Sequence, residues 1–262
     1  MYEHYWGLKE LPFENVPDPR FFYRSPQHEE ALGRLSYAVR TCKGTALLTA
    51  EIGSGKTLVS RALILELMLE SRWKIALITY PALSAMELLR EILYQLGVNT
   101  PQGTKVDLLH SLNNEMVKNM KDGKHTVIII DEAQTIDDMN IFEELRLLLN
   151  FQLNERFLLT LILLGQPNLR EKISKIPALE QRIFIKYYLS ALSLSQTEEY
   201  IAFRLRTAGS QRNVFTKEAI KIIHEYSQGI PRKINSVCDL SLLSGFSRKL
   251  KHIDSDIINW VG

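Results

Sequence analysis

Short, unbroken apolar runs alternate with longer segments of helical spacing along the first two thirds of the chain. The apolar runs lie at residues 45–50, 74–80, 126–131, 157–166 and 182–189. The helical patterns lie at 27–40, from Lys56 onward, at 84–96, at 106–121 and at 142–153. Continuous apolar strands that alternate with helices are typical of a parallel sheet covered on both faces. We therefore expect an α/β fold.

The pattern changes to helices alone after Leu189. The sequence S-Q-T-E from Ser195 to Glu198 predicts a capping box at the start of a helix. Glycines and a proline mark the further helix boundaries. The expected boundary residues are Gly209 at the end of the first helix, Thr216 and Gly229 around the second, and Pro231 in the first turn of the third.

These patterns divide the chain into three parts. Residues 1–26 are rich in aromatic residues and prolines, which disfavours disorder and predicts a segment packed on the rest of the protein. Residues 27–191 are expected to form the α/β domain. Residues 192–262 are expected to form a small helical lid.

Composition restricts the class of protein without identifying it. The chain has 262 residues, of which 45% are hydrophobic and 24% charged, and a net charge of +2, so nothing in the charge balance by itself predicts nucleic-acid binding. Cys42 and Cys238 have no metal-ligand spacing, which predicts neither a disulfide framework nor a zinc site. The apolar stretch 157–164 is too short to span a membrane. We expect a cytoplasmic protein with no transmembrane segment in this chain.

The sequence TAEIGSGKTL at residues 49–58 resembles a phosphate-binding loop, with Ala50 in place of the first glycine of G-x-x-x-x-G-K-[ST]. Lys56 is suited to reach the outer phosphates of a nucleotide, and Thr57 to bind magnesium. If the backbone at position 50 has a negative φ, alanine costs little there. The alternative is a chance match in a surface loop. The candidate nucleotide-binding residues are Glu51, Ile52, Gly53, Ser54, Gly55, Lys56, Thr57 and Leu58.

Two more strand ends carry polar residues suited to nucleotide chemistry. In TVIIIDEAQ, Asp131 ends a buried strand, where a carboxylate needs a compensating cation, and magnesium would supply one. Glu132 follows and is suited to polarise an attacking water. In LILLGQ, Gln166 is a candidate to hold that water or contact the γ-phosphate, and capping the turn before Pro167 is an equal alternative.

Two arginines are candidates to stabilise charge during phosphoryl transfer. Arg182 precedes the last strand, and Arg232 lies in GIPRKIN at the start of a lid helix. Guanidinium groups suit phosphate oxygens. A solvated or structural role is the alternative for each of them.

The motifs IGSGKT, IIIDEAQ, GQPNLR, LEQRI and GIPRKINSVCD, in this order, resemble the AAA+ ATPases of the ExeA type, the general secretion pathway protein A family. The resemblance also includes the opening segment and covers nearly the whole chain. It implies a P-loop NTPase (AAA+) domain with a helical lid, ATP as the nucleotide and Mg²⁺ as its metal. It further implies that Arg182 is an arginine finger acting on a neighbouring subunit, that Gln166 lies near sensor 1 and that Arg232 is the sensor 2 arginine of its own subunit.

The sequence departs from this family at Ala50 and in length. Members of the family often continue into a transmembrane segment and a peptidoglycan-binding module, so we expect either a short stand-alone member or the ATPase part of a longer protein.

Three functions remain open from the sequence. The first is an ATPase that drives oligomer assembly or remodelling of an envelope secretion, pilus or export system, as a ring or filament with a protein partner, in the cytoplasm or peripheral at the inner membrane. The second is a DNA-bound ATPase like the related transposition regulators. The third is a nucleotide-binding module with negligible turnover. Candidate DNA contacts are Arg232, Lys233, Arg248, Lys249 and Lys251, for which a solvated helix face is the alternative.

Overall fold

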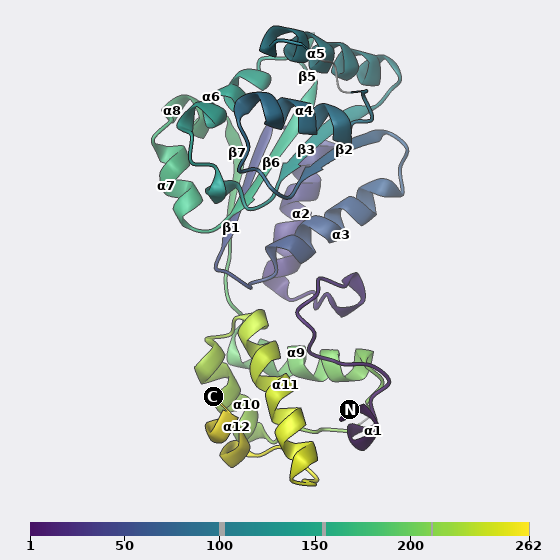
Figure 1. Cartoon of the computed structure of the whole chain (residues 1–262), viewed down its shortest axis with the longest axis vertical. Helices are drawn as coiled ribbons and strands as arrows, with labels where there is room; N and C mark the ends of the chain where they lie inside the picture. Colours follow the sequence, from purple (N-terminus) through teal and green to yellow (C-terminus); the bar gives the residue numbers. More distant parts are fainter. Residues whose placement is uncertain (100–102, 154–155, 211, 262) are drawn as a thin grey trace. The chain divides into compact units, whose positions relative to one another are not determined.

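The computed structural model describes residues 1–99, 103–153, 156–210 and 212–261 (Figure 1). Contacts divide the chain into two compact units. The first unit comprises residues 1–29, 51–58 and 190–262, and the second comprises 30–50 and 59–189. The boundaries expected at residues 26 and 191 stay predictions, and the predicted end of the lid at residue 262 lies outside the described residues.

A five-stranded parallel sheet forms the centre of the second unit, in the order β2-β3-β6-β1-β7. This confirms the parallel sheet that the unbroken apolar runs predicted. Every residue of β1 and β6 is buried, because helices cover both faces of the sheet. The strands are β1 (Thr45–Ala50), β2 (Trp73–Ile78), β3 (His125–Ile130), β6 (Leu159–Gly165) and β7 (Ile183–Leu189).

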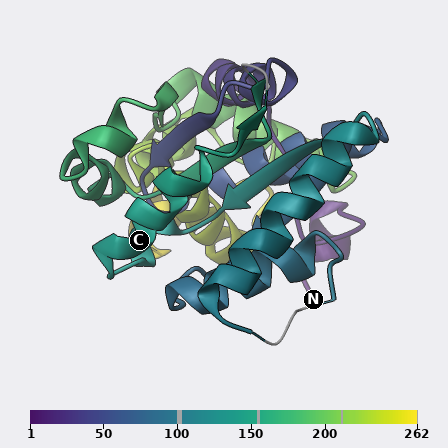
Figure 2. The ribbon, with the colours of Figure 1, turned by 90° about the horizontal axis from the view of Figure 1, so that it is seen from above.

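Helices lie against both faces of this sheet, with α2 and α5 on opposite sides of it (Figure 2). Leu93 of α4, Leu112 of α5 and Phe142 of α6 belong to one hydrophobic core with the strands. Burial of side chains of this size stabilises the fold by about 1.5–3 kcal/mol each. The helices that follow or precede the strands are α2 (Pro26–Arg40), α3 (Lys56–Met68), α4 (Ala85–Gln95), α5 (Lys105–Lys121), α6 (Met139–Leu148), α7 (Asn168–Ser174), α8 (Pro177–Glu180) and the 3-10 turn η2 (Ala133–Thr135).

The structure corrects two expected elements around residue 150. The helix expected at 142–153 begins at Met139, because Asp138 caps it by accepting from the amide of Asn140, and it ends at Leu148. The strand expected at 157–166 begins only at Leu159. Between them, β4 (Gln152–Leu153) and β5 (Arg156–Phe157) form a short antiparallel pair, which the apolar pattern did not predict.

The first unit has a separate core, in which aromatic residues near the N-terminus pack against the C-terminal helices. Trp6 is buried, and its indole nitrogen donates to the carbonyl of Leu242 over 2.9 Å. Arg204 donates to the carbonyls of Pro12 and Glu14 over 2.6 and 2.8 Å. The elements of this unit are α1 (Glu3–Trp6), η1 (Pro19–Phe21), α9 (Leu194–Thr207), α10 (Lys217–Ser227), α11 (Pro231–Ser247) and α12 (Ser255–Val261).

The capping box expected at Ser195 and Glu198 was wrong by two residues. Ser193 is the N-cap of α9: its hydroxyl accepts from the amide of Gln196, whose side chain accepts from the amide of Ser193. A serine three residues before Gln or Glu occurs in both registers of the sequence, and the helix starts at the earlier one. By contrast, Thr216 and Pro231 begin α10 and α11 as expected.

Within the described part of the chain, none of the helices has both the length and the apolar character that crossing a membrane requires.

Candidate nucleotide site

The loop that follows β1 and precedes α3 is shaped by two glycines whose backbone is unfavourable for other residues. Gly53 and Gly55 have φ angles of +82° and +101°. The amide of Ser54 donates to the carbonyl of Glu51 over 3.2 Å, and Nζ of Lys56 donates to the same carbonyl oxygen over 3.1 Å. Lys56 is buried at the first position of α3. The loop is thus a compact turn that leads directly into the start of a helix.

Two other segments of the first unit lie against this loop. The amide of Arg232, in the first turn of α11, donates to the carbonyl of Gly53 over 3.2 Å, and a Cβ at Gly53 would lie 2.5 Å from Cβ of Arg232. Nε2 of His28 lies 3.0 Å from the carbonyl oxygen of Ser54, and a Cβ at Gly55 would lie 2.9 Å from that nitrogen. The glycines are therefore required by the packing around the loop as well as by its φ angles.

Ala50 is compatible with the loop because its backbone is that of a strand. It is the last residue of β1 and is fully buried. An extended backbone has a negative φ, which alanine adopts without strain. Ala50 therefore has no need of the conformational freedom of the glycine that it replaces.

The chemistry of the loop suits an anionic group. Backbone amides at the start of α3 have no partners within the helix, and the lysine supplies a positive charge. Oγ of Ser54 is buried without a hydrogen-bond partner in the part of the chain that the structure describes. Amides, an ammonium group and hydroxyls together fit a phosphate chain.

Acidic and amide side chains of the second unit lie at the carboxyl ends of the strands. Asp131 and Gln166 directly follow β3 and β6, which are neighbours in the sheet. Asp131 is buried, and its Oδ1 accepts from the amide of Glu132 over 2.9 Å. Glu132 has a φ of +51°, a left-handed conformation that is uncommon outside glycine and asparagine. This backbone turn directs the chain out of the strand.

Gln134 joins these residues and was not among the predicted site residues. Its Nε2 donates to Oε2 of Glu132 over 2.5 Å, and its Oε1 accepts from the amide of Gln166 over 3.1 Å. Gly165 leaves room for this contact, because a Cβ there would lie 2.8 Å from Oε1 of Gln134. Lys172 of α7 donates to the carbonyl of Gln134 over 2.8 Å. The one signal in the sequence is weak: a glutamine stands two residues after the acidic pair Asp131 and Glu132.

Arg182 lies apart from these residues, at the amino end of β7. Its guanidinium donates to Oδ1 of Asn150 over 2.6 Å and to the carbonyl of Arg146 over 3.4 Å. It lines a hollow of about 300 Å³ with Lys43 and Phe184. Within the second unit, Arg182 therefore lies at the amino ends of the parallel strands, whereas Asp131 and Gln166 lie at their carboxyl ends.

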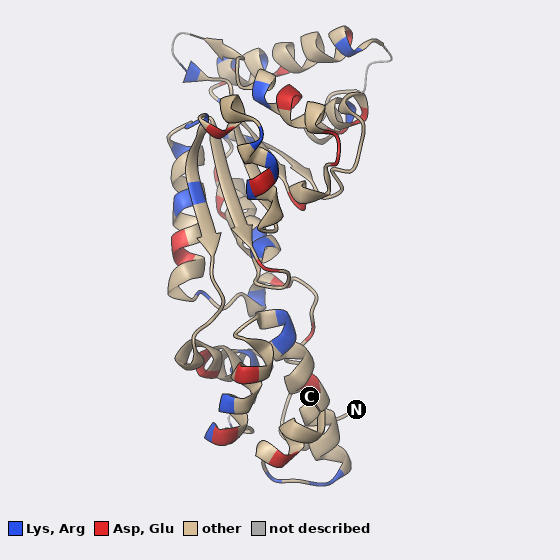
Figure 3. Cartoon of the chain, turned by 90° about the vertical axis from the view of Figure 1, so that its left-hand side faces the viewer, with Lys and Arg blue, Asp and Glu red and all other residues tan. Residues whose placement is uncertain are grey.

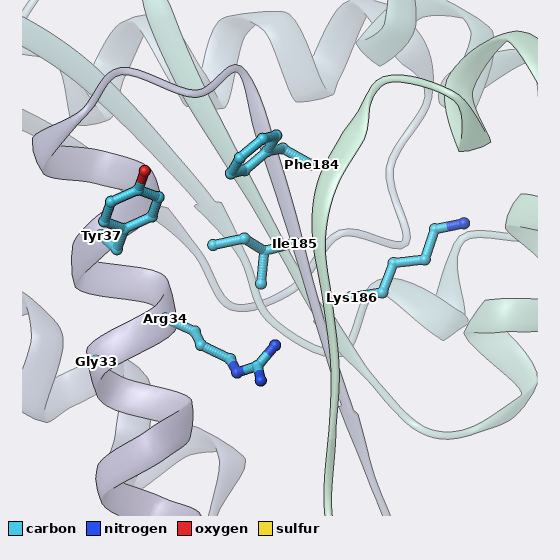
Figure 4. A pocket seen from close by; sticks show the side chains of 6 residues that line it. All are labelled: Gly33, Arg34, Tyr37, Phe184, Ile185 and Lys186. Carbon is cyan, nitrogen blue, oxygen red and sulfur yellow. The ribbon is translucent and has the colours of Figure 1, made fainter.

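A second hollow, of about 440 Å³, lies between α2 and β7 and contains none of the predicted site residues (Figure 4). The rings of Tyr37 and Phe184 stack there with their centroids 6.4 Å apart. The guanidinium of Arg34 lies 5.1 Å from the ring centroid of Tyr187. Its lining is aromatic and basic, with no carboxylate among the residues that line it.

Sequence comparisons identify a matching family and a relative that covers nearly the whole chain. The model of a family described as AAA domain matches residues 39–173. General secretion pathway protein A of Aeromonas hydrophila is 38% identical over 261 residues. This similarity covers 97% of the chain but 47% of that protein, so the chain spans about half the length of that relative.

Solved structures share the fold at low sequence identity. The ORC2 protein of Aeropyrum pernix, in its ADPNP–ADP complexes, superposes with a TM-score of 0.67 at 17% identity, over 92% of this chain and 70% of that one. The ORC1 protein of the same organism, in complex with DNA, gives 0.69 at 15% identity, over 95% and 68%. At these identities the likeness establishes the fold alone. The family match shows that this chain belongs to the AAA domain family, and the parallel sheet together with these structures shows that it has the P-loop NTPase fold of the AAA+ ATPases.

Proposed function

We propose that this protein binds and hydrolyses ATP and uses that cycle to drive oligomer assembly or remodelling in a cell-envelope secretion or export system. The observation that carries the proposal is the 38% identity to general secretion pathway protein A over nearly the whole chain. Such a role would place the protein in the cytoplasm, or at the inner membrane through a protein partner.

In this proposal, the loop of residues 51–58 holds the phosphates. Its backbone amides and the start of α3 face the negative charge, and Lys56 reaches the outer phosphates. The glycine φ angles and the buried lysine support this role. Arg232, whose backbone amide donates to the Gly53 carbonyl of the loop, would report the bound nucleotide to the helices of the first unit.

The remaining predicted residues have roles in hydrolysis. Thr57 and Asp131 would hold Mg²⁺, which neutralises phosphate charge when it is bound; a hydroxyl and a carboxylate are oxygen ligands of the kind that this ion prefers. Glu132 orients the attacking water and accepts its proton, and Gln166 contacts the water or the γ-phosphate. Arg182 would act on the site of a neighbouring subunit.

Particle mass in the presence of ATP tests the assembly function. The variant Glu132→Gln should bind ATP without turnover and accumulate as oligomers with ATP and magnesium, while Lys56→Ala should remain unassembled. A Glu132→Gln protein that stays monomeric at every ATP and protein concentration would exclude nucleotide-driven assembly. If wild-type protein binds ATP but releases no phosphate, alone or with candidate partners, it is a binding module without turnover.

A DNA-bound ATPase is the second candidate, supported by the shared fold with an ORC1 protein solved in complex with DNA. The five basic candidate residues do not form one cluster. Arg232 and Lys233 begin α11, whereas Arg248, Lys249 and Lys251 follow its other end, about 25 Å away along a helix of this length. Basic and acidic segments also lie side by side on both units (Figure 3).

Salt dependence distinguishes the two candidates. Phosphate contacts would make duplex binding weaken steeply as salt rises. Absence of duplex binding at low salt, with and without ATP, would eliminate the DNA candidate. Export or pilus genes beside this one would support the first candidate, and transposase genes the second.

A further inference from the structure

His28 is a buried histidine that contacts the loop, and no motif singled it out. It lies in the first turn of α2, with 4% of its surface exposed. Its Nε2 lies 3.0 Å from the carbonyl oxygen of Ser54, and its Nδ1 lies 2.6 Å from Oγ of Ser25, which is fully buried. All of these residues belong to the first unit.

The partners of the ring define its tautomer. A carbonyl oxygen only accepts, so Nε2 carries the hydrogen and donates it to Ser54. The other nitrogen of a neutral ring has a lone pair, so Nδ1 accepts from the hydroxyl of Ser25. Burial lowers the pKa of His28 below its usual value, although the bond to the Ser54 carbonyl acts in the opposite direction, and the neutral ring is consistent with this direction.

This contact fixes the orientation of one peptide group in the loop. The carbonyl of Ser54 and the amide of Gly55 belong to the same planar trans peptide, in which C=O and N–H point in opposite directions. Holding the carbonyl toward His28 therefore turns the amide of Gly55 away from it. The φ of +101° at Gly55 is part of the same arrangement, and a Cβ there would lie 2.9 Å from Nε2.

We propose that His28 is a positioning residue of the nucleotide site: by holding the Ser54 carbonyl, it aims the Gly55 amide at a phosphate of the bound nucleotide. The proposal rests on the proposed function, because it needs phosphate at residues 51–58. Ser25 contributes by fixing the tautomer in which Nε2 is the donor.

Two variants separate positioning from space filling. His28→Phe keeps a ring of similar size but has no donor, whereas His28→Gln has an Nε2 amide that can donate to the Ser54 carbonyl. We expect His28→Phe to weaken ATP binding with magnesium about tenfold, and His28→Gln to recover most of that loss. Titration calorimetry gives the affinities, and thermal unfolding without nucleotide gives the stability of each variant. A histidine that only fills space would show the reverse order, with phenylalanine the better substitute.

His125→Phe is the matched control. His125 is also largely buried with a hydroxyl partner, Oγ1 of Thr160 at 2.9 Å, but it begins β3. This variant should lose stability without losing ATP affinity. If His28→Phe does not fold, Ser25→Ala replaces it, with an expected loss of about threefold in affinity.

The outcomes separate this inference from the proposed function. If wild-type protein binds ATP and Lys56→Ala does not, the nucleotide site stands. ATP affinity of a folded His28→Phe or Ser25→Ala protein within about twofold of wild type then overturns the role of His28 alone. If wild-type protein binds no ATP, the proposed function fails first.

Discussion

In the loop at residues 51–58, backbone groups make the contacts that hold the segment, whereas at the acidic end of β3 side chains make them. Gly53 and Ser54 present carbonyls that Arg232 and His28 hold. At the end of β3, the side chain of Gln134 connects the carboxylate of Glu132 to the amide of Gln166. The first region thus depends on backbone conformation, and the second on the identity of each side chain.

This difference explains why the same type of change has unequal consequences in the two regions. A side chain is unfavourable where it collides with a neighbour or where φ is positive. Ala50, at the end of β1, is therefore tolerated, whereas a side chain at Gly53 would force the loop to shift. At the strand end, a change of one atom in a side chain alters the chemistry while the backbone stays as it is. We expect loop variants to change nucleotide affinity and strand-end variants to change turnover.

The largest expected effect belongs to Glu132→Gln. An amide of the same shape cannot accept a proton from water, so phosphate release should fall about 10³-fold while ATP affinity stays within about threefold. Steady-state phosphate release and titration calorimetry give the two values. Glu143→Gln, a surface change in the ion pair with Arg146, is the control. Turnover within about tenfold of wild type would show that a group other than Glu132 accepts the proton.

Gly53→Ala should act on affinity. The new Cβ would lie 2.5 Å from Cβ of Arg232 at a φ of +82°, so the loop must shift, and ATP affinity should fall about 30-fold. Gly33→Ala is the matched control, because Gly33 lies within α2 and a Cβ there has nothing within 4 Å. Unchanged affinity in Gly53→Ala would show that the loop accommodates a side chain at this position, and that nucleotide binding does not depend on the backbone conformation of Gly53.

Gln134→Ala should reduce turnover about tenfold and leave ATP affinity nearly unchanged. The variant frees the carboxylate of Glu132 and removes one hydrogen bond from the Gln166 amide, a loss of about 1 kcal/mol in positioning. Gln95→Ala is the control, because Gln95 also donates to a carboxylate, that of Glu91, on an exposed helix face. A fall in affinity without a fall in turnover would show that Gln134 contributes to nucleotide binding, as the loop residues do, rather than to hydrolysis.

Ala50→Gly should have the smallest effect. It restores the usual loop glycine, yet the position is an extended and fully buried strand residue, so ATP affinity should stay within about twofold. Stability should fall by roughly 0.5–1 kcal/mol, because glycine loses more backbone entropy in a strand. Thermal unfolding measures the loss. A tenfold gain in affinity would mean that the methyl group obstructs the loop.

Local patterns in the sequence determined the α/β fold and the order of its elements. The apolar runs located β1 and β3 to within a residue, because a strand buried on both faces must be apolar throughout. The run at 182–189 also located β7, although this edge strand has exposed residues that alternate with buried ones. The motif from Glu51 to Leu58 and the acid after β3 can likewise be recognised from consecutive residues of the sequence. Local signals failed where two registers were equally good, as at Ser193 and Ser195, or where a short strand pair interrupted an apolar stretch.

Only the tertiary structure decided which residues support the candidate site. His28 contacts Ser54 across 26 positions, and Gln134 contacts Gln166 across 32. The start of α11 reaches Gly53 across a still longer separation. Contacts of this kind leave no periodicity or spacing in the sequence, because they follow from how separate elements pack rather than from the preferences of neighbouring residues. The sequence by itself therefore identified the groups that we propose to carry the chemistry, and the folded chain decided what holds them in place.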